Sequence, residues 1–301
     1  MNTKLRNSYL AIGLMTMSIQ AQALTVNGVL SDAAAGTTLA TAWLGASSGV
    51  TIVGPVNYVG STTTGQAGTY TDLTLNSSVS DAAHPDIALG NGIVMTSGTT
   101  AIPTSNTQSS FGVDLGLAGD PAITALSGNP SFDANSLSFS FKVASGITSI
   151  STNFIFGSDE YPEFAGTSFS DGFAFIVDGK NYAKFADGSA VSLKTLGSNN
   201  NLLNNTTGAY GIEYDGITQA LTIDGLLDNS LSTHTLKIVI SDTGDGVYDS
   251  GVFLSSLSAG KSDTGGVKPP PGAVPEPEVY AMMLAGLGLV GYAARRRKAA
   301  K

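Results

Sequence analysis

Four carboxylates lie within thirteen residues of one stretch of this sequence, at Asp159, Glu160, Glu163 and Asp171. Apolar side chains alternate on both sides of the stretch, at Phe154 and Phe156 before it and at Phe173, Phe175 and Val177 after it. A period of two is typical of half-buried strands, so the carboxylates are predicted to lie in a loop between two strands. Unpaired carboxylates are costly to bury, and such a loop must expose them to water, pair them with cations or place them on a metal.

A second acidic cluster follows about seventy residues later, at Asp242, Asp245 and Asp249. Calcium takes about six to eight oxygens on adjustable loops, and glycine-flanked aspartates at a sandwich rim supply them. We expect the two clusters to lie together and to hold calcium through Asp159, Glu160, Asp171 and Asp242. An EF-hand is excluded, because glycines occupy two positions that would need oxygen ligands. The alternative is that these side chains form Asx-turns, cap strand ends or face water.

Three aromatic residues, Tyr161, Phe164 and Phe169, belong to the same acidic loop. Ring faces can stack on sugars while neighbouring carboxylates accept hydrogen bonds from hydroxyls, so the three are candidate ligand-binding residues. The alternative is that they fold inward and form a small apolar plug under the loop.

Signals for catalysis are weak, and we predict no catalytic residues. The chain has two histidines, His84 and His234, outside any zinc motif, and it has no cysteine and no Gly-x-Ser-x-Gly sequence. A glycosidase would need two carboxylates facing a cleft, and Asp159 with Glu163 or Asp171 is the one pair to consider.

The composition is typical of an exported β protein. The 301 residues include 37 glycines and no cysteine, and only 12% are charged. Residues 24 to 268 contain seven basic and 21 acidic residues, a net charge of −14, which argues against nucleic acid as a partner.

Both ends of the chain contain targeting signals. Residues 1 to 23 have a basic start, a short apolar run and an Ala-Gln-Ala site, and they are predicted to be a signal peptide removed by signal peptidase. A Gly/Ser/Pro linker is expected over 260–273. The end, 274–301, contains Pro275, Glu276 and Pro277, then an apolar segment over 279–294 that predicts a hydrophobic transmembrane helix, then a basic tail over 295–301.

The body, 24–259, is predicted to be one all-β domain, a two-sheet antiparallel sandwich of jelly-roll type with one or two short helices. Short helices are expected over 38–44 and 120–126. Gly90-Asn91-Gly92 is expected to form a turn, and 198–205 a loop. Strands are expected over 49–53, 56–59, 69–75, 93–95, 137–143, 147–156, 172–177, 182–185, 209–214, 219–223, 235–240 and 251–257.

Two families resemble parts of the chain. The order of Pro275-Glu276-Pro277, apolar segment and arginine cluster resembles the PEP-CTERM protein-sorting signal of Gram-negative bacteria. Phe156-Gly-Ser-Asp-Glu-Tyr-Pro-Glu-Phe164, Phe169-Ser-Asp-Gly-Phe-Ala-Phe175 and Thr243-Gly-Asp-Gly-Val-Tyr-Asp-Ser-Gly-Val-Phe253 resemble the choice-of-anchor L domain.

The first resemblance implies processing by an exosortase near Pro275, Glu276 and Pro277. It also implies a precursor held transiently in the inner membrane and then release to the cell surface or the extracellular exopolysaccharide matrix. The second implies a sandwich fold and no established catalytic activity. We therefore expect a non-enzymatic protein that contributes to exopolysaccharide or biofilm structure. The alternatives are a calcium-dependent carbohydrate-binding module and, less favoured, a polysaccharide hydrolase.

Overall fold

The computed structural model describes residues 24–268, except positions 46, 80, 82 and 199–200. The expected signal peptide and the expected hydrophobic helix over 279–294 lie outside the described residues. Among the residues that the structure describes, no helix is long and apolar enough to span a membrane.

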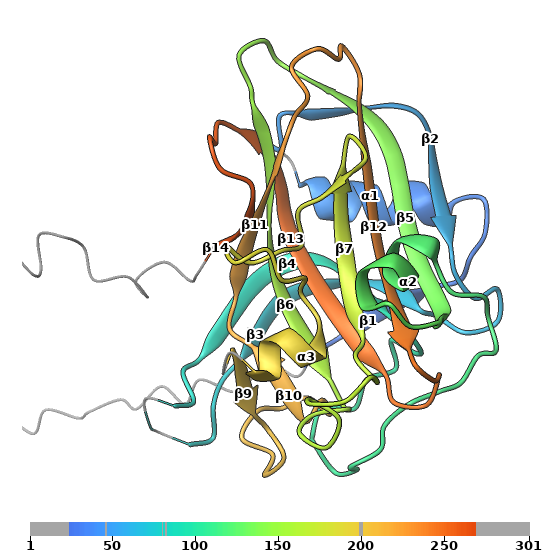
Figure 1. Ribbon diagram of the computed structural model, residues 1–301, viewed down its shortest axis with the longest axis vertical. Helices are drawn as coiled ribbons and strands as arrows, with labels where there is room; N and C mark the ends of the chain where they lie inside the picture. Colours follow the sequence, from blue (N-terminus) through green and yellow to red (C-terminus); the bar gives the residue numbers. More distant parts are fainter. Residues whose placement is uncertain (1–23, 46, 80, 82, 199–200, 269–301) are drawn as a thin grey trace, which may run out of the picture.

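Two antiparallel sheets form a sandwich, which confirms the expected fold class (Figure 1). Among the described residues, one sheet has five strands in the order β2 (Val50–Val59), β5 (Ser131–Val143), β12 (His234–Thr243), β7 (Gly172–Val177) and β8 (Lys180–Asn181). The larger sheet follows the order β1 (Val26–Val29), β3 (Ala67–Leu75), β4 (Ile87–Thr96), β13 (Ser250–Gly260), β6 (Ser149–Ser158), β10 (Gly216–Thr218) and β9 (Leu202–Asn204). It also includes β11 (Leu221–Leu226), which pairs with β6 and with β14 (Gly266–Lys268).

The main core lies between the two sheets. Phe139 and Phe141 of β5, together with the buried residues of β7 in the same sheet, face Phe154 and Phe156 of β6 across it. The side chains that alternate with Phe139 and Phe141 on β5 are serines and a lysine, and they are less buried, as the sequence pattern predicts for a sheet with one solvated face.

A second apolar core covers the outer face of the larger sheet. Ile155 of β6 and Phe253 of β13 pack there against Phe111, Tyr210 and Tyr214, which come from segments outside the strands. The larger sheet is therefore buried on both faces. The irregular segment between residues 98 and 120 supplies Phe111 to this second core.

Three short helices complete the described chain, one more than the upper expectation. α1 (Ala35–Leu44) contributes Trp43, which is fully buried and donates from its indole N–H to Thr152 Oγ1 at 2.9 Å. α2 (Pro121–Ser127) begins as expected, with Asp120 as its N-cap and Pro121 in its first turn, and packs on the five-stranded sheet. α3 (Leu193–Ser198) was not expected.

Two sequence predictions of strands are wrong. Residues 209–214 form no strand: Asn205 Nδ2 donates to the carbonyls of Ile212 and Tyr214, at 2.9 Å each, and its Oδ1 accepts from the N–H of Tyr210. The amide side chain of Asn205 thus makes the backbone hydrogen bonds that a neighbouring strand would otherwise make. The alternating apolar residues of this segment are buried, but they do not belong to a sheet. Residues 182–185 make only an isolated bridge, and the strand before them is β8.

Three further differences concern turns and loops. Gly90 to Gly92 lie within β4 instead of forming a turn. Gly90 is opposite Leu73 of β3, and the strand pairing shifts register on both sides of Leu73. The expected loop over 198–205 contains β9, and the expected linker over 260–273 contains β14, whose residues pair with Thr222 to Asp224.

Two chain connections cross between the sheets at the same end of the sandwich, the lower end in Figure 1. One runs from β6 to β7 and contains Asp159 to Asp171; the other runs from β12 to β13 and contains Gly244 to Asp249. Strand pairing fixes their proximity, because Ser250 of β13 lies opposite Ser158 of β6, and Ser241 of β12 lies opposite Gly172 of β7.

Candidate cation site at the end of the sandwich

The two connections that cross between the sheets are hydrogen-bonded to each other. The N–H of Asp159 donates to the carbonyl of Asp249 at 3.1 Å. On the other side of the connections, the N–H of Thr243 donates to Asp171 Oδ1 at 2.9 Å, and the N–H of Ser170 donates to Thr243 Oγ1 at 3.2 Å. These contacts hold the carboxylates of two distant sequence segments at one place.

All four predicted metal ligands are almost completely buried. The exposed fraction is 0% for Asp171, 1% for Asp159 and Asp242, and 2% for Glu160. The ion pairs His84–Asp81, His234–Asp178, Lys237–Asp120 and Lys268–Asp224 all use other carboxylates. None of these four ion pairs therefore compensates the buried acids at this end of the sandwich.

Asp242 is the most closely surrounded acid of the group. Within the described chain its side-chain oxygens and Oδ2 of Asp171 make no hydrogen bond of standard geometry, yet Ser97 and Asp171 lie close enough to Asp242 to lower its pKa through hydrogen bonding. Burial raises the pKa of both side chains well above the usual range, and the charge of Asp242 raises the pKa of Asp171 further. Asp171 and Asp242 thus form a close, buried pair of acids.

Glu160 joins this pair. Its Oε2 accepts from the N–H of Asp171 at 3.3 Å. Burial raises the pKa of Glu160 to about 9, and the neighbouring charge of Asp171 contributes to the shift. Three of the four predicted ligands therefore lie together.

Asp159 belongs to a different part of the acidic region. One of its oxygens accepts from the N–H of Phe111, and within the described residues the other has no partner. Burial raises its pKa to about 7, and the nearby charges of Asp215 and Glu213 act in the same direction. The charges of Asp159, Asp171, Asp242 and Asp249 all act on Tyr214, so Asp159 borders the group formed by Glu160, Asp171 and Asp242.

Asp249, which was noted in sequence but not among the predicted ligands, lies beside Asp242. Its carboxylate accepts from the N–H groups of Val113 and Thr99, at 3.1 and 3.3 Å, and burial raises its pKa to about 7. Its charge also raises the pKa of Asp242. Gly98 makes room for it, because a β-carbon there would lie 1.9 Å from Asp249 Oδ2.

Asp133 is an acidic residue of this end that the sequence analysis missed. It is fully buried on β5, and its two oxygens accept from the N–H groups of Leu115 and Leu117, at 2.7 and 2.5 Å. The nearby charge of Asp114 adds to the effect of burial in raising its pKa. The sequence signal is weak, because Asp133 is a single acidic residue near the start of β5.

Tyr214 lies over a pair of glycines next to the acidic group. Gly157 of β6 and Gly251 of β13 are opposite each other, and β-carbons on them would lie 2.5 Å from Tyr214 Cδ2 and 2.4 Å from Tyr214 Oη. The hydroxyl is fully buried and has no hydrogen-bond partner in the described chain. Burial raises its pKa well above the usual range, and the charge of Asp249 raises it further.

Gly157→Ala is expected to destabilise the protein by about 1–3 kcal/mol, because the new methyl group would overlap the Tyr214 ring. Urea unfolding of the exported protein measures the change. Gly166→Ala is the matched control, since a β-carbon there meets no atom within 4 Å, and it should stay within about 0.5 kcal/mol. Equal effects of the two substitutions would refute this account of Tyr214.

The aromatic residues of the acidic loop pack on one another. Phe164 contacts Phe169 at a ring-centre distance of 5.7 Å and Tyr248 at 5.4 Å, and Tyr161 and Phe164 also pack against the main core. All of them are half-buried. This arrangement matches the expected alternative of an apolar plug better than an open platform for sugars.

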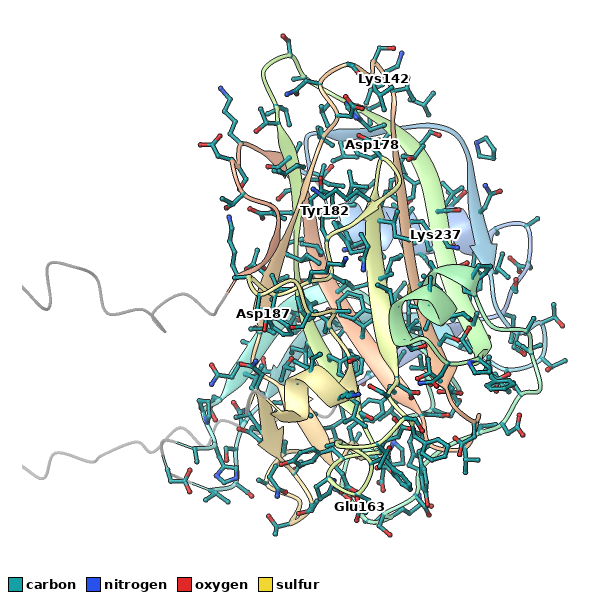
Figure 2. The ribbon with its side chains drawn as sticks, in the orientation of Figure 1. Lys142, Glu163, Asp178, Tyr182, Asp187 and Lys237 are labelled. Carbon is teal, nitrogen blue, oxygen red and sulfur yellow. The ribbon has the colours of Figure 1, made fainter. Side chains whose placement is uncertain are left out.

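Glu163 and the two histidines lie apart from the buried acids. Glu163 is exposed at the lower end of the molecule (Figure 2). His234 Nδ1 lies 2.7 Å from Asp178 Oδ2, near the opposite end, and His84 pairs with Asp81 at the surface.

The residues fit a calcium ion only if oxygens other than carboxylates take part. Among the described residues, no three His, Asp or Glu side chains are placed so that they could hold a metal by themselves. Calcium commonly completes its shell with carbonyls, hydroxyls and water. The unpartnered oxygens of Asp171 and Asp242 are the carboxylate ligands that this end of the sandwich offers.

The family comparisons agree with the architecture. The choice-of-anchor L domain matches residues 37–260, and the PEP-CTERM protein-sorting motif matches residues 273–298. Comparison with curated proteins and with solved structures gave no match. The sorting motif marks a precursor that passes through a membrane and is processed by an exosortase. The chain therefore belongs to the choice-of-anchor L family, and its PEP-CTERM motif makes it an exported, exosortase-processed protein of the cell surface.

Proposed function

We propose that this surface protein is non-enzymatic, binds calcium at the end of the sandwich through Asp171 and Asp242 together with carbonyl, hydroxyl or water oxygens, and contributes to an exopolysaccharide or biofilm matrix. Signal peptidase removes residues 1–23, and the inner membrane of a Gram-negative cell holds the precursor before release. Asp159 is left out of the proposed ligand set, because one of its oxygens accepts a hydrogen bond from the N–H of Phe111.

The carboxylate of Asp242 is the observation that supports calcium. It is 1% exposed, it lies beside the second buried carboxyl of Asp171, and in the described chain its oxygens make no hydrogen bond of standard geometry. An ionised carboxylate in such a place costs several kcal/mol unless a proton or a cation compensates it. Calcium is the cation whose oxygen preference and adjustable coordination suit two loops of this kind.

The burial of the acids also supports a non-enzymatic role. A glycosidase needs two carboxylates that reach its substrate. Asp159 and Asp171 are almost fully buried, whereas their possible companion Glu163 is exposed. A pair with such different access does not suit acid–base catalysis on a polysaccharide.

A cation at this place would have a structural purpose. The chain has no cysteine, so no disulfide can stabilise it outside the cell. Both connections that cross between the sheets meet at the acidic group, and a bound cation would hold the sheets together there.

Calcium is expected to raise the melting temperature of the exported protein at pH 8 by several degrees relative to EGTA, because the ion binds the folded state. Differential scanning calorimetry measures the shift. Magnesium serves as a comparison, since its stricter octahedral geometry should give a smaller effect. The same melting temperature in calcium and in EGTA would rule out the calcium proposal.

A further inference from the structure

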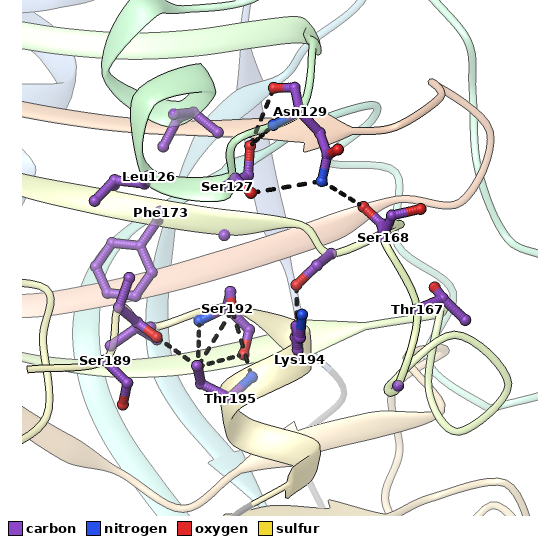
Figure 3. A pocket seen from close by; sticks show the side chains of 16 residues that line it. Leu126, Ser127, Asn129, Thr167, Ser168, Phe173, Ser189, Ser192, Lys194 and Thr195 are labelled. Carbon is purple, nitrogen blue, oxygen red and sulfur yellow. Dashed lines mark hydrogen bonds between the residues drawn. The ribbon is translucent and has the colours of Figure 1, made fainter. Parts of the chain in front are cut away.

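A pocket of about 480 Å³ lies between the end of α2, the acidic loop and the start of α3 (Figure 3). Most of its polar side chains already bond to one another or to the backbone. Asn129 Nδ2 donates to the carbonyl of Ser168 at 3.1 Å, and the hydroxyls of Ser192 and Thr195 lie 3.2 Å apart. These bonds hold the three segments together, so the pocket offers few free groups to a ligand. The surface around β14 offers more to a partner.

β14 lies between the two family matches. The choice-of-anchor L match ends at residue 260, and the PEP-CTERM match begins at residue 273. Within the segment between them, Gly266–Lys268 nevertheless add a strand to the larger sheet by pairing with β11. This strand therefore extends the domain and carries the sorting signal.

Hydrogen bonds hold the extension at several points. The N–H of Val267 donates to the carbonyl of Lys184 at 2.8 Å. Before β14, the N–H of Ser262 donates to Thr148 Oγ1, and Thr148 Oγ1 donates to the carbonyl of Ser262, both at 3.1 Å. The chain is therefore held against the domain as far as β14 (Figure 1).

The reach from this fixed strand to the processing motif is short. Lys268 pairs with the buried carboxylate of Asp224, and six residues, 269–274, separate it from Pro275. A chain spans at most about 3.6 Å per residue, so Pro275 can be at most about 25 Å from Lys268. A globular domain of 100 residues is already roughly 30 Å across. An enzyme that holds the Pro-Glu-Pro motif in its active site therefore has to lie against this domain near β14.

We propose that β14 is a clamp that fixes where the chain leaves the domain, and that the exosortase docks on the surface around it. This surface is formed by β11, Lys184 and residues 261–265, of which 261 and 263–265 are exposed. The proposal rests on processing of the sorting motif and is independent of the calcium proposal.

Deleting Pro269, Pro270 and Pro271 shortens the reach by about 10 Å and leaves the clamp in place. The exosortase should then process the precursor about tenfold more slowly, because a tether that cannot span two sites brings their effective concentration close to zero. Pulse-chase labelling of cells that contain the exosortase measures the rate. Replacing the three prolines with alanines is the matched control, since it keeps the length and should leave the rate unchanged.

Gly266→Ala should restore processing of the shortened precursor. Gly266 has a φ of +116°, and a β-carbon there would lie 2.8 Å from the carbonyl oxygen of Lys184, so the substitution should release β14. Release frees residues 263–268 and lengthens the tether by up to about 20 Å. Gly260→Ala is the matched control, because a β-carbon there would lie 3.8 Å from Ser149 Oγ and should not restore processing.

A photocrosslinking amino acid tests the docking surface itself. At Asp263 it should join the precursor to the exosortase, and at Glu163, at the lower end of the molecule (Figure 2), it should not.

The proposal fails if the shortened precursor is processed at the wild-type rate, if both glycine variants or neither of them restore processing, or if the two positions crosslink equally. A precursor that is still processed after replacement of Pro-Glu-Pro would instead be a failure of the sorting motif. The melting-temperature response to calcium is independent of all these results.

Discussion

Asp242→Asn is expected to raise the melting temperature in EGTA at pH 8 and to remove most of the stabilisation by calcium. In EGTA the substitution removes a buried acid whose raised pKa shows that its ionised form is disfavoured in the folded state, so the cost of ionising or protonating it at pH 8 disappears. In calcium it removes a ligand, so the affinity for the ion should fall at least tenfold. The sign of the effect should therefore reverse between the two conditions, as measured by calorimetry.

The same account gives the direction of the pH dependence. Burial raises the pKa of Asp159 and Asp249 to about 7 and that of Glu160 to about 9, above the values of about 4 in the unfolded chain. Between those values the folded protein binds more protons than the unfolded one, so stability in EGTA should fall as the pH rises from about 4 to 9. Calcium should flatten this decline.

Asp263→Asn is the control for these measurements, because Asp263 is exposed and lies outside the acidic group. It should leave the calcium response and the pH profile unchanged. The interpretation is wrong if Asp242→Asn lowers the melting temperature equally in calcium and in EGTA, since the carboxylate would then have only a packing role.

Replacing Pro275, Glu276 and Pro277 with alanines should block processing by the exosortase. The precursor is then expected to accumulate in the membrane fraction as a larger species, and the amount released should fall at least tenfold. Immunoblots of membrane and medium fractions measure both. Replacing Pro269, Pro270 and Pro271 with alanines is the matched control in the preceding linker, and unchanged release in both variants would show that the Pro-Glu-Pro motif is not needed.

The sandwich could be predicted from sequence where apolar residues alternate. Phe139 and Phe141 mark β5, and Phe154 and Phe156 mark β6, because a strand buried on one face must repeat every two residues. The same pattern was misleading at Tyr210 to Tyr214, where side chains are buried but Asn205 satisfies the backbone. A single amide that replaces a strand leaves no periodic signal.

The sequence predicted the part of the site that comes from the two acidic clusters. The grouping of Asp159 to Asp171 with Asp242 to Asp249 followed from two acidic loops, and strand pairing brings them together. The hydrogen bond that Asp159 accepts from Phe111 could not be foreseen, because Phe111 reaches the sheet from an irregular segment. The pocket beside α3 had no sequence signal, since its lining residues come from three separate regions.

A crystal structure of the exported protein grown in calcium tests the central claim most directly. The account predicts an anomalous peak for calcium about 2.3–2.6 Å from carboxylate oxygens of Asp171 and Asp242, with Glu160 nearby. A structure in which the carboxyl groups of Asp171 and Asp242 instead share a proton, with no ion beside them in saturating calcium, would contradict it.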